Sequence, residues 1–251
     1  MGHGRRALQL PPQSLEEDED GHPNPSLQEV KLGNLISGAA EQVPYAHPAQ
    51  MRLARVVNQL ARTDRCTKLV DIEDYKKFES MDSFRQNCGE RGDRSWYSES
   101  EAKRLLNTVA FQARPFTIRL VDHTPNKIWV LRFTLEVPAS KISPANFSTR
   151  VAIAALWVVY GGHAMFNAVI VNTEPLNAMS QWSQTKELHN GLIFGNERWR
   201  FWIGRLRKIC EDGSSATATP GPTVSDEARQ LGLKAVKPME ALAETVEDIA
   251  I

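Results

Sequence analysis

The segment at residues 151–173, VAIAALWVVYGGHAMFNAVIVNT, holds no charged residue over the whole of its length. A segment this long and apolar is either a membrane span or a helix enclosed by other helices. Gly161, Gly162 and His163 interrupt its centre, where polar groups are costly in hydrocarbon. Only Arg150 flanks it, without a cluster of Lys or Arg, so a buried core helix is favoured over a membrane span.

Amphipathic helices are expected on both sides of this segment, because apolar residues recur there at three- and four-residue intervals. The expected helices cover, in approximate bounds, residues 48–60, 71–84, 99–114, 124–137, 145–174, 197–211 and from 226 onward. Pro115, Pro138 and Pro175 are expected to end helices, and Pro238 to kink or divide the last one. Long helices without a run of strands predict an all-α fold, a single multi-helix, bundle-like domain.

Charge is balanced in the whole chain but segregated along it. The 251 residues carry 30 Lys and Arg and 30 Asp and Glu, which excludes a strongly basic nucleic-acid scaffold. Residues 1–46 hold three cations and seven acids and are expected to be a disordered or weakly structured acidic segment. Residues 47–251 are expected to form the all-helical domain, with a flexible loop at 212–223 whose sequence is rich in Gly, Ser, Thr and Pro.

The N-terminus and the cysteines indicate a cytoplasmic protein. No apolar run of signal-peptide length follows Arg5 and Arg6. Cys66, Cys88 and Cys210 are far apart and show no spacing typical of a disulfide framework or of a zinc site. A reducing, intracellular location without a bound metal is therefore expected.

Trp157, Tyr160 and His163 are the candidate ligand-binding residues of the central segment. Trp157 and Tyr160 lie three residues apart and share one face of a helix. Core packing is favoured over an apolar pocket for a small metabolite, since large aromatic residues are mostly structural. His163 has no second His at helical spacing, so a buried or half-buried structural role is favoured over a base or a ligand. No catalytic residue and no cofactor is assigned.

Gly161 and Gly162 fit neither of the glycine patterns of phosphate-binding loops. They indicate instead the close approach of another helix.

The basic helix expected over residues 197–208, ERWRFWIGRLRK, carries five cations against one acid. Arg198 and Arg205 are its candidate partner-surface residues. A phosphate- or nucleic-acid-facing surface is one interpretation. The favoured one is an amphipathic helix with its Trp residues toward the core, in which late cations favour the helix dipole and arginines pair with neighbouring carboxylates.

Five motifs follow one another in the second half of the chain. They are AFQAR at residues 110–114, WVLR at 129–132 followed by LE at 135–136, AALWVVYGGHAMF at 154–166, GLIFG at 191–195 and ERWRFWIGRL at 197–206. In this order they resemble a family of uncharacterised filamentous-fungal proteins, a domain-of-unknown-function group. Phe194 departs from the Trp that the family's turn often carries, and Pro115 and Pro238 interrupt its helices.

The resemblance implies a soluble, all-helical domain from a fungus that makes secondary metabolites. Its members are often encoded in or near biosynthetic gene clusters, and it implies no known catalytic residues. The leading hypothesis is therefore an accessory intracellular protein that binds a small apolar metabolite or a pathway enzyme. One alternative is a small helical enzyme that uses Tyr160 and His163 as acid and base on a hydrophobic intermediate. Another is a regulatory protein that uses the basic helix; neither a nucleic acid nor a membrane is favoured as partner.

Overall fold

The computed structural model describes residues 35–61, 98–116, 124–171, 188–189, 195–212 and 224–247. Within these ranges all regular structure is helical, which confirms the all-α prediction. The elements are α2 (Pro48–Ala61), α5 (Glu99–Phe116), α6 (Thr124–Leu135), a short 3₁₀ turn η3 (Ala139–Lys141), α7 (Pro144–Val171), α8 (Asn196–Asp212) and α9 (Asp226–Glu247). A further helix covers residues 35–42.

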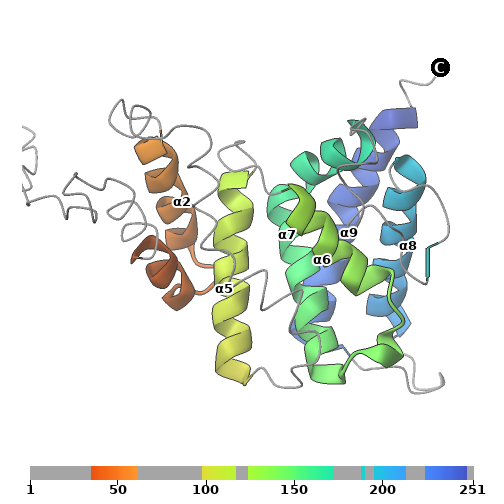
Figure 1. Cartoon of the computed structure of the whole chain (residues 1–251), viewed down its shortest axis with the longest axis horizontal. Coiled ribbons are helices and arrows are strands. Elements are labelled where there is room, and N and C mark those ends of the chain that lie inside the picture. The colour runs from red at the N-terminus through yellow and green to blue at the C-terminus, as the bar shows by residue number, and fades with distance from the viewer. Residues whose placement is uncertain are drawn as a thin grey trace, which may run out of the picture.

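The uncharged segment supplies most of α7, the central helix of the bundle. α7 packs against α5 on one side and against α6, α8 and α9 on the other (Figure 1). Residues 151–158 are all buried, on every face of the helix, and this accounts for an apolar pattern without a polar side. Among the described helices, Asn146–Ile170 is long and apolar enough to cross a membrane, and 61% of its most apolar window is buried within the bundle.

The core between α7, α8 and α9 is built around large aromatic side chains. Trp199 and Trp202 are fully buried on α8, and Trp157 of α7 is buried in the same main core. Phe166 meets Trp199 edge to face, with ring centroids 5.2 Å apart. Such edge contacts add to the free energy gained by burial of the rings, so this cluster fixes how α8 lies against α7.

Two helices begin at side-chain caps. At the start of α5 the Ser98 backbone N–H donates to Glu101 Oε2 at 2.8 Å, and the Glu101 N–H donates to Ser98 Oγ at 3.3 Å. These reciprocal bonds make a capping box. At the start of α9 the Ala228 N–H donates to Ser225 Oγ at 3.3 Å, so Ser225 caps that helix.

The prolines interrupt the helices less than expected. α5 includes Pro115 and ends one residue later, and α6 ends at Leu135, ahead of Pro138. α9 runs unbroken through Pro238, so the expectation that this proline divides the last helix was wrong. Pro238 removes the donor to the carbonyl of Lys234, an exposed position where solvent can replace that donor.

A smaller layer packs outside the bundle. Residues 35–42 and α2 lie against α5, on the side away from α8 and α9 (Figure 1). They share a separate apolar cluster of Ala40, Ala54 and Phe111. The expected boundary between residues 46 and 47 falls inside this layer, because residues 35–42 are helical and Ala40 is completely buried. The tail up to residue 34, the helix expected over 71–84 and residues 213–223 of the loop lie outside the described residues.

Candidate functional site

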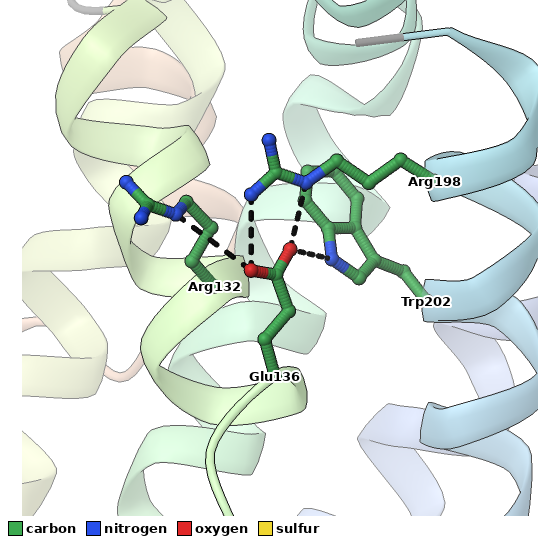
Figure 2. Close-up of polar contacts among 4 residues, drawn as sticks. All are labelled: Arg132, Glu136, Arg198 and Trp202. Atoms are coloured by element: carbon green, nitrogen blue, oxygen red, sulfur yellow. Dashed lines mark hydrogen bonds and ion pairs between the residues drawn. The ribbon is translucent and has the colours of Figure 1, made fainter. Parts of the chain in front are cut away.

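The most concentrated chemistry among the described residues lies where the end of α6 meets the start of α8. Arg132 is on the last turn of α6, and Glu136 follows that helix directly, with its N–H donating to the Arg132 carbonyl at 2.8 Å. Arg198 and Trp202 are one turn apart on α8 and point toward Glu136 (Figure 2). We call these four residues the Glu136 cluster.

Glu136 accepts from three donors at close range. Arg198 holds it with both arms of its guanidinium, Nε to Oε1 at 2.7 Å and Nη2 to Oε2 at 3.0 Å. The Trp202 indole N–H donates to the same Oε1 at 2.8 Å. Arg132 Nε lies 3.7 Å from Oε2 (Figure 2). A bidentate Arg–carboxylate pair fixes orientation as well as distance, so the cluster sets the position of α8 on α6.

The cluster is sealed from solvent. The side chains of Arg132, Glu136 and Arg198 are all 0% exposed. Burial first, and then the nearby charge of Arg198, lower the pKa of Arg132 to about 10. Each guanidinium also lies 5.2 Å from an indole ring, Arg132 over Trp129 and Arg198 over Trp202. The aromatic faces add a cation–π attraction where one carboxylate stands between two cations.

This geometry suits a structural ion pair that holds two helices together and not a group that takes part in a reaction. A general base must reach the proton that it abstracts, and an enclosed carboxylate held by three donors cannot meet a substrate. The Glu136 carbonyl also accepts the Leu188 N–H at 3.0 Å, which ties the segment before α8 to the end of α6.

Arg198 was a candidate partner-surface residue, and the structure corrects this in favour of the other interpretation, in which the arginine pairs with a carboxylate of a neighbouring segment. Arg198 is fully buried and bound to Glu136. Helical spacing could have predicted this burial, because Arg198 lies one turn from Trp202 and two turns from Leu206, on the apolar stripe of α8. Arg132 and Glu136 likewise stand four residues apart at the end of an apolar helix.

The rest of the basic helix is partly engaged within the chain. Arg207 forms an ion pair with Glu240 of α9. Arg205, the second predicted surface residue, is half-buried, whereas Arg200 is exposed. α8 is therefore an amphipathic helix with its Trp residues inward, which is the interpretation favoured from the sequence, and no continuous cationic face involves Arg198.

Trp157, Tyr160 and His163 do not converge on one site. Trp157 is 2% exposed and belongs to the main core. Tyr160 is half-buried, and the Arg114 guanidinium lies over its ring, 3.7 Å from the centroid. His163 is exposed and its Nδ1 lies 3.3 Å from Asn167 Nδ2, so the buried or half-buried role expected for it was wrong. Its helical position turns it away from the core that Trp157 enters.

Metal and thiol chemistry find little support in the part of the chain that the structure describes. No three His, Cys, Asp or Glu side chains gather there in an arrangement that could hold a metal ion. Cys210 is 1% exposed, and burial raises the pKa of its thiol to about 11, which makes it a poor nucleophile. Cys66 and Cys88 lie outside the described residues.

Comparison with known proteins gives a family and no closer relative. No curated protein and no solved structure matches the chain. A family described as "Protein of unknown function (DUF3632)" matches residues 34–206, well over half of the 251 residues. The matched region contains α2, α5, α6, α7, most of α8 and every residue of the Glu136 cluster. The chain therefore belongs to this family of proteins of unknown function, DUF3632.

Proposed function

We propose that this protein is an intracellular accessory protein of a fungal secondary-metabolite pathway and that it acts by binding rather than by catalysis. The pathway is proposed from the resemblance of the five ordered motifs to a fungal family. The observation that carries the binding role is the enclosure of the Glu136 cluster, whose three charged side chains are 0% exposed. The strongest charges in the described core hold helices together and are out of reach of a substrate.

The enzyme alternative rests on Tyr160 and His163, and their surroundings favour it less. Arg114 covers one face of the Tyr160 ring, and His163 lies in solvent beside Asn167. A general acid–base pair needs both groups directed at one reacting centre in a site that limits water. An exposed imidazole next to an amide lacks that setting.

The outer face of α2 supports a protein partner over a small metabolite. Met51 and Val56 are 43% and 45% exposed, and Arg52 and Arg55 are exposed beside them. α2 contains no acidic residue, so this face is both cationic and apolar. It is complementary to an acidic surface with apolar side chains, and we propose that a pathway enzyme provides that surface. The small apolar metabolite is the other proposed partner, and it would need access near Trp157.

Deletion of the gene in its fungus, followed by profiling of secondary metabolites, tests the pathway role. We expect the end product of one pathway to fall and an intermediate to accumulate, because an accessory protein supports one step. An unchanged metabolite profile would contradict the pathway role.

Complementation of the deletion strain tests the α2 face. A double variant, Met51→Glu with Val56→Glu, should fold normally because both sites are exposed, yet fail to restore the metabolite profile, because it puts negative charge on the docking face. A matched double variant on α9, Lys234→Glu with Lys237→Glu, also alters two exposed residues and should restore the profile. Restoration by both variants would exclude α2 as the partner surface.

A further inference from the structure

The contact between the layer formed by residues 35–61 and the bundle differs in composition from the core of the bundle. Its fully buried apolar part consists of Ala40, Ala54 and Phe111, two of them alanines, with Ile36, Leu53 and Val57 partly buried against them. The main core, by contrast, contains three fully enclosed tryptophans. Since the free energy gained by burial follows apolar area, the apolar part of this contact is much the weaker of the two.

Polar side chains add hydrogen bonds to this contact. Gln50 is completely buried, and its Nε2 donates to the carbonyls of Ala40 at 3.0 Å, Val43 at 2.7 Å and Asn107 at 3.3 Å. Asn107 of α5 accepts the Tyr45 N–H at 2.8 Å and donates to the Glu41 carbonyl at 2.8 Å. These bonds reach the backbone of the outer layer, so they exist only while residues 41–45 keep their folded path.

Arg114 and Tyr45 connect the same layer to two further helices. Arg114 Nη2 donates to the Tyr45 carbonyl at 2.9 Å while its guanidinium lies over the Tyr160 ring of α7. The Tyr45 hydroxyl donates to Glu227 of α9 at 2.7 Å. The turn at Tyr45 therefore carries hydrogen bonds to both α5 and α9, and these bonds must form or break together.

We propose that residues 35–61 act as a latch that opens from α5 and closes again as one unit while α5, α6, α7, α8 and α9 stay folded. A weak apolar contact with shared polar links is typical of a segment that opens by sub-global unfolding. Opening of the latch exposes Phe111 and breaks the hydrogen bond from Arg114 to the Tyr45 carbonyl, while Arg114 stays beside the Tyr160 ring. This creates an apolar and cationic strip on α5. The latch stands independently of the function proposed above.

Hydrogen exchange of the full-length protein, followed by mass spectrometry over a series of low urea concentrations, tests the latch. The amides of α2 should share one opening equilibrium that depends on urea and that lies below global unfolding. Asn107→Ala removes two bonds to the outer layer and should speed exchange over residues 35–61 by about 30-fold, with α7 and α9 unchanged.

Thr108→Ala is the matched control, since Thr108 is the next residue on α5 and donates only to the Arg104 carbonyl of its own helix. It should leave exchange of residues 35–61 at the wild-type rate. Three results would each overturn the latch: α2 amides that exchange only with those of α7, α2 exchange that does not depend on urea, or acceleration by Asn107→Ala that is equal in α2, α7 and α9.

Discussion

At the scale of single residues, the Glu136 cluster shows how charge can specify a helical bundle. Burying an ion pair gains little net free energy against a well-packed apolar alternative, but removing one partner leaves the other charge without compensation. Glu136 satisfies Arg198 and Trp202 at once, in a geometry that only one placement of α8 allows. We therefore interpret the cluster as a device that fixes the register of α8 on α6.

Glu136→Gln should lower the free energy of unfolding by about 3–5 kcal/mol, because it removes the buried negative charge that Arg198 and Arg132 share. Urea unfolding monitored by circular dichroism measures the change. Glu99→Gln is the control, since the Glu99–Lys103 ion pair is well exposed, and it should leave the unfolding curve unchanged. A loss below about 1 kcal/mol for Glu136→Gln would show that the carboxylate does not hold the cluster.

Cys210 should make stability depend on pH in alkaline solution. Burial raises the pKa of its thiol from 9.0 to about 11, so the native chain keeps a proton that the unfolded chain loses between these values. The contribution is complete below pH 9 and declines as the pH rises through 11, by up to about 2–3 kcal/mol. Unfolding free energies of the wild type and of Cys210→Ala, compared across that range, should converge as the pH rises. A constant difference between the two proteins would contradict the assignment.

At the scale of elements, α8 and α9 are in close contact at a glycine. A Cβ placed on Gly232 of α9 would lie 2.3 Å from Cys210 Sγ on α8, a distance that forces a shift. Gly162, where the sequence suggested a close approach, would accept a Cβ at ordinary contact, 3.5 Å from Val158 and 3.9 Å from Leu242. The close crossing is therefore at residue 232, and it joins the two last helices.

Gly232→Ala should destabilise the protein by about 1–3 kcal/mol through overpacking, although alanine favours a helix. Gly204→Ala on α8 is the control, because a Cβ there meets nothing within 4 Å, and it should stabilise by up to about 1 kcal/mol. Removing the sulfur with Cys210→Ala should relieve most of the loss, and thermal melts of the four proteins give the comparison. Equal melting temperatures for the two alanine variants would exclude a close crossing.

The helices could be predicted from the sequence because their information is local. The capping box at Ser98, the uncharged stretch of α7 and the apolar stripe of α8 each fix an element within a few turns. The pairing of Arg198 with Glu136 joins residues 62 positions apart in the sequence. The local sequence around an arginine on an apolar stripe does not show whether its partner is a water molecule or a distant carboxylate. The position of His163 was missed for a related reason, since local pattern does not show which side of α7 lacks a covering helix.

At the scale of the whole molecule, rigid and accessible parts are separated. α2 lies outside the bundle around α7, beside α5 (Figure 1). The bundle holds the aromatic core and the buried charges, whereas α2 presents an apolar and cationic face. The neutral total charge conceals an uneven distribution, because residues 1–46 carry three cations and seven acids whereas residues 47–251 carry 27 cations and 23 acids. The arrangement suits a protein that presents a surface to a partner, with its most strongly interacting charges used for folding.

One measurement tests the proposal that the protein acts by binding and not by catalysis. The gene-deletion strain is complemented with the double variant Tyr160→Phe and His163→Ala, which removes both candidate acid–base groups, and its secondary metabolites are profiled by mass spectrometry. We expect the wild-type profile, because we propose that neither group transfers a proton to a substrate. Accumulation of the intermediate seen in the deletion strain, with the variant protein folded and present at wild-type level, would contradict it.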